Sequence, residues 1–145
     1  MSIQTLPELF LTAVREHARP DCFSYRDDSG QYVDVSSEEA HRRVRALRLG
    51  LKSLGVRPGD RVALFMDRVP ELYIGFVGIL KAGCIVQPLF SAFVQESLET
   101  RMEDAGTSVV ITQLRHARKI RKIRENLPAP DEPEAGRSHW REETR

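Results

Sequence analysis

The sequence holds few of the residues that build disulfide frameworks or metal sites. Its 145 residues include four histidines and two cysteines, Cys22 and Cys84, which lie far apart in the chain. No histidine or cysteine lies at metal-ligand spacing from another, so we expect neither a zinc site nor another metal site. Two unpaired thiols suit a reducing compartment, and we expect the protein in the cytoplasm.

Neither sign of charge dominates, and long apolar runs are missing. Lysine and arginine number 22 and aspartate and glutamate 21, which leaves a formal net charge of +1. This balance predicts neither nucleic acid nor an anionic membrane as partner. The longest apolar stretch, residues 72–86, contains Gly75, Gly78, Lys81 and Gly83 and is shorter than the roughly 18 residues of a membrane span. The first five residues lack the pattern of a secretory signal.

The first half of the chain predicts two helices around a β-hairpin. Apolar residues recur at helical spacing over residues 6–18, and we expect a core-facing stripe of Leu6, Leu9, Phe10, Ala13, Val14 and His17. Residues 22–27 and 31–35 flank the turn sequence Asp-Ser-Gly and predict the hairpin. Ser36 and Glu39 have capping-box spacing and begin a helix that Gly55 ends. Its apolar stripe lies opposite cations that we expect to be solvated: Arg42, Arg43, Arg45, Arg48 and Lys52.

From residue 61 onward, short apolar runs alternate with helical patterns. We expect strands at 61–66, 84–89 and 108–112, and helices at 69–82, 95–105 and 115–126. This alternation predicts an α/β fold in which βαβαβα crossovers build a parallel sheet. Gly75 and Gly78 in the second of these helices should let another element approach closely.

The chain divides into one partial domain and a tail. Residues 1–127 contain all the predicted elements, whereas residues 128–145 hold three prolines, many charges and Trp140 as the one large apolar residue. So few apolar groups cannot offset the entropy lost on ordering, and we expect this tail to be disordered.

The strand-to-helix junctions carry no complete catalytic motif. The sequence contains no Gly-x-Gly-x-x-Gly, Walker A or Gly-x-Ser-x-Gly pattern. Asp67, after the first parallel strand, could hold a cation or a ribose, but a lone acid in such a turn is more often a local cap. Ser91, after the second strand, has no histidine partner in the sequence nearby. The densest signal is a basic cluster in the last predicted helix: Arg115, His116, Arg118, Lys119, Arg121, Lys122 and Arg124. Of these, Arg118 and Arg121 share one helical face and could grip a phosphate, or belong to a solvated face.

Several runs together resemble a known family. They are Gly-Asp-Arg-Val at 59–62, Pro-Glu at 70–71 and Lys-Ala-Gly at 81–83. In this order they resemble the N-terminal core of the adenylate-forming superfamily, which includes AMP-forming acyl-CoA synthetases. Pro-Leu-Phe-x-x-Phe at 88–93 and Val-Ile-Thr at 110–112 are similar to the acetyl-CoA synthetase branch. The resemblance covers residues 6–127.

The resemblance implies a reaction and part of a binding site. Full-length relatives convert a short carboxylic acid, ATP with Mg²⁺ and coenzyme A (CoA) into acyl-CoA, AMP and pyrophosphate, through an acyl-adenylate. It further implies that Phe90, Ser91 and Ala92, in the loop after the second parallel strand, contact the CoA nucleotide together with Arg118 and Arg121. Ser91 and Ala92 stand where the family usually has glycines.

The family's catalytic motifs do not occur in these 145 residues. The sequence lacks the Thr-Ser-Gly-x-Thr-Gly-x-Pro-Lys-Gly phosphate loop, the Tyr-Thr-Glu-type motif for adenine and Mg²⁺, and the C-terminal lysine motif. We therefore expect a truncated synthetase, without catalytic residues of its own and inactive alone. Two alternatives stay open: a non-catalytic CoA-binding or interaction module, and a split subunit completed by another chain. Exposed sheet edges would suit self-association or a complementing chain.

Overall fold

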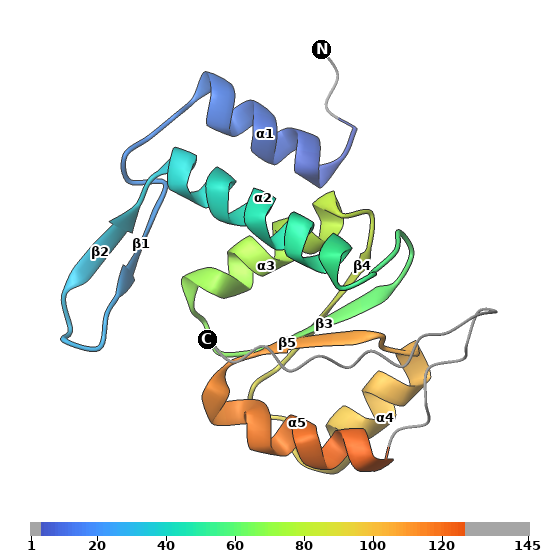
Figure 1. Ribbon diagram of the computed structural model, residues 1–145. Helices are drawn as coiled ribbons and strands as arrows, with labels where there is room; N and C mark the ends of the chain where they lie inside the picture. Colours follow the sequence, from blue (N-terminus) through green and yellow to red (C-terminus); the bar gives the residue numbers. More distant parts are fainter. Residues whose placement is uncertain (1–3, 127–145) are drawn as a thin grey trace.

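The computed structural model describes residues 4–126 and confirms the predicted α/β class (Figure 1). Its elements are α1 (Leu6–Glu16), β1 (Phe23–Arg26), β2 (Tyr32–Val35), α2 (Ser37–Ser53), β3 (Arg61–Phe65), α3 (Pro70–Lys81), β4 (Ile85–Leu89), α4 (Gln95–Ala105), β5 (Val109–Thr112) and α5 (Leu114–Asn126). Their order is the predicted one, and the predicted boundaries differ by a residue or two. The predicted tail, residues 128–145, lies outside the described residues.

The three parallel strands lie in the order β4-β3-β5, so β3 is central. The chain moves from β3 to β4 through α3 and then back past β3 to β5 through α4. Because right-handed crossovers in opposite directions place their helices on opposite faces, α3 and α4 cover different faces of the sheet. Figure 1 shows this arrangement, with α2 and α3 on one side of the sheet and α4 and α5 on the other.

Alternating side chains of β3 divide the interior into two cores. Val62 and Leu64 point into the core beneath α2 and α3, together with Leu51, Met66, Ile79 and Cys84. Ala63 and Phe65 point into the core beneath α4 and α5, together with Leu89, Leu98, Met102 and Ile123. This two-sided burial is typical of a parallel strand that is apolar on both faces.

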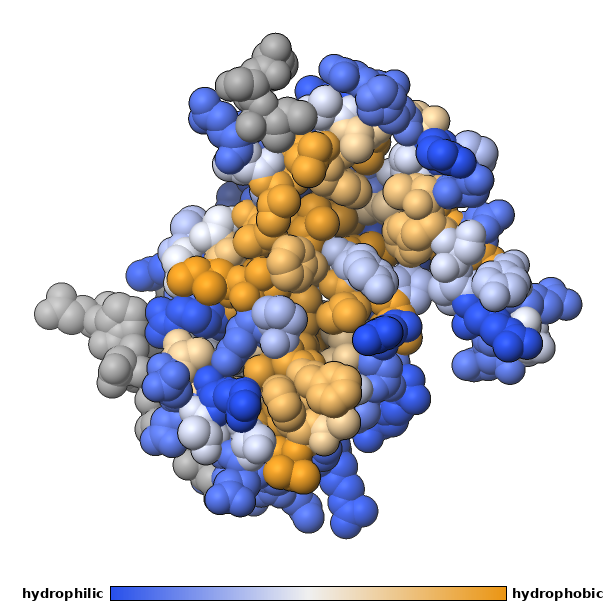
Figure 2. Space-filling model, turned by 180° about the vertical axis from the view of Figure 1, so that it is seen from behind, coloured by the Kyte–Doolittle hydropathy of each residue, from blue (hydrophilic) through white to orange (hydrophobic). Residues whose placement is uncertain are grey.

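The second parallel strand is apolar, but it lies at an edge of the sheet. Ile85 in β4 is 54% exposed, and Pro88 has no N–H to donate to a further strand, which suits an edge position. Among residues 4–126, the outer edges of β4 and β5 have no partner strand. Apolar surface is exposed elsewhere as well: Figure 2 shows an apolar band down the back of the molecule. None of the helices in this part of the chain is long and apolar enough to cross a bilayer.

The predicted core stripe of the first helix was partly wrong. Leu6 and Leu9 are 57% and 49% exposed, whereas Phe10, Leu11 and Val14 are half-buried. The helix faces the rest of the protein with a stripe rotated from the predicted one, because α1 rests on both α2 and α3. It begins with a complete capping box, in which Glu8 N–H donates to the Thr5 hydroxyl and Glu8 accepts from the Thr5 N–H.

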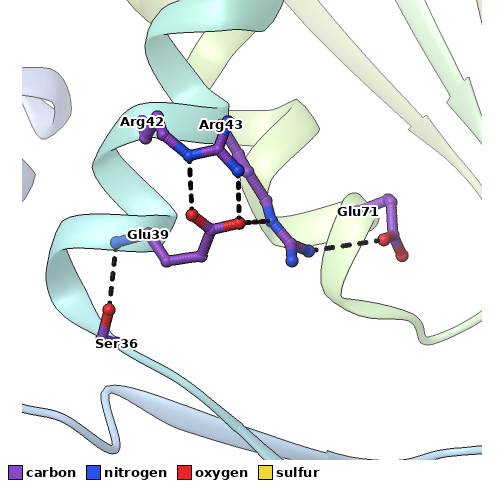
Figure 3. Close-up of polar contacts among 5 residues, drawn as sticks. All are labelled: Ser36, Glu39, Arg42, Arg43 and Glu71. Atoms are coloured by element: carbon purple, nitrogen blue, oxygen red, sulfur yellow. Dashed lines mark hydrogen bonds and ion pairs between the residues drawn. The ribbon is translucent and has the colours of Figure 1, made fainter.

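The predicted capping box at Ser36 is half formed (Figure 3). Ser36 caps α2 by accepting from the Glu39 N–H at 3.1 Å. The Glu39 carboxylate does not return to Ser36, since it pairs with Arg42 at 2.7 Å and Arg43 at 2.6 Å. Hydrogen bonds from these two arginines lower the Glu39 pKa to about 2. The prediction of a solvated face thus holds for Arg42, which is 70% exposed, but not for the half-buried Arg43, which also lies 3.8 Å from Glu71 of α3.

Two glycines set the spacing of α3, as predicted. A Cβ at Gly75 would lie 2.8 Å from the Leu64 side chain of the sheet, and one at Gly78 would lie 2.7 Å from Leu47 Cδ2 of α2. In both cases the close neighbour is a leucine side chain. Gly78 is the tighter contact, because its Cβ would also lie 3.3 Å from Leu47 Cβ, which cannot rotate away.

We expect Gly78→Ala to lower the free energy of unfolding by about 1 to 3 kcal/mol, since α2 and α3 would have to move apart. Gly50→Ala is the matched control, because it lies in α2 with no atom within 4 Å of its added Cβ. That variant should gain up to about 1 kcal/mol from helix propensity. Urea denaturation of both variants checks this, and a stabilised Gly78→Ala would contradict the described α2–α3 packing.

Candidate functional site

The candidate site lies where the three parallel strands end. Asp67 follows β3 closely, the loop of residues 90–93 follows β4, and Gln113 follows β5. Because parallel strands bring their carboxyl ends to one edge, these three junctions are neighbours. Open α/β sheets commonly bind ligands at this edge.

Asp67 connects all three junctions. Its Oδ2 lies 2.6 Å from Arg115 Nη2 and its Oδ1 lies 3.3 Å from His116 Nε2. The hydrogen bond from Ser91 is the largest cause that lowers the Asp67 pKa, and His116 and Arg115 lower it further, against the effect of partial burial. Asp67 is therefore no local cap, contrary to its interpretation from the sequence.

Further hydrogen bonds fix the β5–α5 junction against the end of β3. The Asp67 N–H donates to Gln113 Oε1 at 2.8 Å, and the Thr112 hydroxyl donates to the Phe65 carbonyl at 2.6 Å. The His116 ring also packs on Phe65, with ring centroids 5.1 Å apart. The start of α5 is thus held against the end of β3 by the hydrogen bonds of Gln113 and Thr112 and by the packing of His116 on Phe65.

Ser91, Asp67 and His116 do not form a catalytic triad. In a triad the histidine takes the serine proton and the acid orients the histidine. Here the Ser91 hydroxyl hydrogen-bonds to Asp67, and His116 Nε2 lies 3.3 Å from Oδ1 of the same carboxylate. Within residues 4–126 no hydrogen bond joins Ser91 to a histidine, so the arrangement suits orientation of the loop.

The loop of residues 90–93 is a turn held against α5. The Phe93 N–H donates to the Phe90 carbonyl at 3.0 Å, and the two rings meet edge to face at 5.8 Å. Lys119 Nζ donates to the Phe93 carbonyl at 2.9 Å, and Arg101 of α4 lies 4.4 Å from the Phe93 ring centre. Phe90 remains 63% exposed, so its ring is open to a ligand.

The structure brings the predicted loop and the predicted basic helix together. Ser91 is half-buried against Asp67, whereas Ala92 is exposed at the tip of the turn. Arg118 and Arg121 lie on the exposed side of α5, whose other side buries Ile123. Lys119, next to Arg118, makes the direct contact between helix and loop.

Four contributors at this edge had no individual role assigned from the sequence. Gln113, Arg115, His116 and Lys119 bond to the ends of the neighbouring strands and loops. The available signal was position, since all four follow β5 at the carboxyl edge of a predicted parallel sheet. The helix carries so many cations that the sequence alone does not distinguish the bonded ones from the solvated ones.

A family model described as "AMP-binding enzyme" matches residues 10–142. The acetyl-coenzyme A synthetase of Laribacter hongkongensis is 33% identical over 99 residues, which make up 68% of this chain and 15% of that protein. The indigoidine synthase of Streptomyces lavendulae is 32% identical over 119 residues, which make up 82% of this chain and 9% of that protein. The chain thus spans a small part of the relatives it matches.

Solved structures show the same fold. An acyl-CoA synthetase of Brucella canis superposes with a TM-score of 0.67 at 28% identity, over 78% of this chain and 22% of that one. The N-terminal domain of FACL13 from Mycobacterium tuberculosis superposes with a TM-score of 0.74 at 22% identity, over 88% of this chain and 31% of that one.

Asp67→Asn should alter the dependence of stability on pH. A carboxyl whose pKa is lowered by folding stabilises the fold above its unfolded pKa of about 3.9, and this stabilisation is lost as the pH falls through the folded pKa. The variant should therefore be less stable than wild type at pH 7, and the difference should shrink below pH 4. Thermal unfolding between about pH 3 and pH 7 measures this. Exposed Asp104→Asn is the control, and a constant difference for Asp67→Asn would contradict the described contacts.

Proposed function

Because the chain belongs to the family of AMP-binding enzymes, we propose that it supplies the N-terminal part of an AMP-forming acid–CoA ligase. The family match over residues 10–142 and the acyl-CoA and acetyl-CoA synthetases among the similar proteins confirm the resemblance seen in the sequence. In the proposed reaction a short carboxylic acid and ATP with Mg²⁺ form an acyl-adenylate and release pyrophosphate, and the acyl group then moves to CoA with release of AMP. In this proposal the chain contributes one edge of the CoA site.

The observation that carries the CoA assignment is the direct bond between the loop and the basic helix. Lys119 Nζ lies 2.9 Å from the Phe93 carbonyl, so residues 90–93 and the start of α5 keep a fixed spacing. A nucleotide needs both a flat apolar surface for its base and cations for its phosphates. This edge offers the exposed Phe90 ring for the first and a row of arginines for the second.

Each proposed contact has a chemical role. The guanidinium groups of Arg118 and Arg121, three residues apart on one exposed helix face, would bind phosphate oxygens through charge-assisted hydrogen bonds. Phe90 would pack on the adenine, and the turn at Ser91 and Ala92 would border the nucleotide. Asp67 orients this turn through Ser91 without touching the ligand.

We expect Arg118→Ala and Arg121→Ala each to weaken CoA binding about tenfold, because each removes charge-assisted phosphate contacts. Isothermal titration calorimetry with CoA and with dephospho-CoA measures this and shows which phosphate is held. Lys52→Ala is the control, since Lys52 is an exposed cation of α2, on the other face of the sheet. Unchanged affinity in both arginine variants, or no CoA binding by the wild type, would contradict the assignment.

We also propose that the chain does not form an adenylate by itself. None of the phosphate-loop, adenine and lysine motifs occurs in the sequence, so no group would stabilise the charge on the leaving pyrophosphate. ATP–pyrophosphate exchange with acetate should stay at background. It should appear when a polypeptide carrying those motifs is added, for which the outer edge of β4, without a partner strand in residues 4–126, offers a contact surface. Robust exchange by the chain alone would contradict this.

A further inference from the structure

The cations on the two sides of helix α2 differ in whether they form ion pairs. On one side, Arg42 and Arg43 share the carboxylate of Glu39, and Arg43 Nη1 also lies 3.8 Å from Glu71 of α3 (Figure 3). These positive charges are therefore balanced by acids from α2 itself and from its neighbour. Within residues 4–126, no ion pair balances the arginines on the other side of the helix.

The second side carries a stripe of basic residues that faces more cations. His41, Arg45 and Arg48 are four and three residues apart, so they lie on one face of α2. Lys81 Nζ, at the end of α3, donates a hydrogen bond to His41 Nε2 at 3.4 Å, and the His41 ring packs edge-on against Phe10 of α1 at 6.4 Å. Arg15, near the end of α1, completes what we call the His41–Lys81 cluster: Arg15, His41, Arg45, Arg48 and Lys81.

Burial and neighbouring cations both oppose the charged forms of His41 and Lys81. Burial lowers the pKa of His41, and Lys81, Arg15 and Arg45 lower it further. Burial likewise lowers the pKa of Lys81, as do Arg48, Arg45 and Arg15. No carboxylate is among the groups that shift either pKa. Within residues 4–126, Arg15, Arg45 and Arg48 take part in none of the ion pairs.

We propose that the His41–Lys81 cluster binds a phosphate group. The Lys81 ammonium of α3 and the His41 imidazole of α2 meet at a half-buried place, and Arg15, Arg45 and Arg48 of α1 and α2 are near enough to shift their pKa values. Guanidinium and ammonium groups are the side chains that hold phosphate oxygens. Repulsion among like charges costs stability, and a bound dianion would reverse the sign of that interaction. The site lies on the α2 and α3 side of the sheet, away from the proposed CoA edge.

A structural reason for Lys81 predicts something different. Lys81 lies in the last turn of α3, where a cation stabilises the helix dipole. If that were its purpose, Lys81→Gln would lower the melting temperature. If Lys81 is kept for an anion, the same change should raise the melting temperature in phosphate-free buffer, because it relieves repulsion.

The experiment measures the melting temperature of the full chain in phosphate and in chloride at matched ionic strength. Wild type should melt several degrees higher in about 20 mM phosphate than in chloride. Arg45→Gln with Arg48→Gln should lose this gain, and Lys81→Gln should lose it while melting higher than wild type in chloride. Arg42→Gln is the matched control: it is a surface arginine of the same helix paired with Glu39, and it should keep the full gain.

Two readouts locate the site and identify the source of the phosphate. In an NMR titration, inorganic phosphate should shift the His41 imidazole signals before those of His17. Sedimentation with vesicles of phosphatidate and phosphatidylcholine then separates a lipid headgroup from a free phosphate, since only the former would retain the protein. The proposal fails if phosphate leaves the wild-type melting temperature unchanged. It also fails if Arg42→Gln loses as much of the gain as the double variant.

Discussion

The burial of β3 on both faces is the constraint on which the rest of the described fold depends. Val62, Ala63, Leu64 and Phe65 are all fully buried, and burying each of the larger side chains is worth about 1.5 to 3 kcal/mol. A strand that is apolar on both sides needs a helical layer on each face. The order β4-β3-β5 supplies both layers, because α3 and α4 cross in opposite directions.

This central position also creates the candidate site. Because β3 lies between the other two strands, a residue just after it can reach the loops that follow both neighbours. Asp67 contacts Ser91, after β4, and His116, after β5. The contacts that hold the loop of residues 90–93 against α5 therefore depend on the same strand that organises the cores. Fold and site are coupled through a single carboxylate at the end of β3.

The sequence predicted the elements well because their signals are local. The Asp-Ser-Gly turn, the two-sided apolar run of β3 and the glycines of α3 each specify one element or one close contact. The face of α1 was less predictable, because Leu6, Leu9 and Phe10 all suit a core and the packing partner decides which are covered. The partners of Glu39 were missed because three groups compete for one carboxylate.

The site was predictable in part for the same reason. The loop after β4 and the arginines of α5 could be named from the family resemblance, and the structure places the loop beside the helix. The hub at Asp67 could not be named, since its partners lie 24 to 49 residues away in sequence and meet because of the strand order. The sequence likewise did not distinguish the cations of α2 from one another. In the structure, those on one side pair with Glu39 and Glu71, whereas those on the other side lie near His41 and Lys81.

Hydrogen–deuterium exchange of the full chain with and without CoA tests the central claim most directly, because it reports on the loop and the helix separately. The account predicts that CoA protects residues 90–94 and the first turns of α5 together, and that Asp67→Asn separates the two effects. Protection confined to one of these segments, or protection elsewhere with both unchanged, would contradict the claim that they form one binding edge.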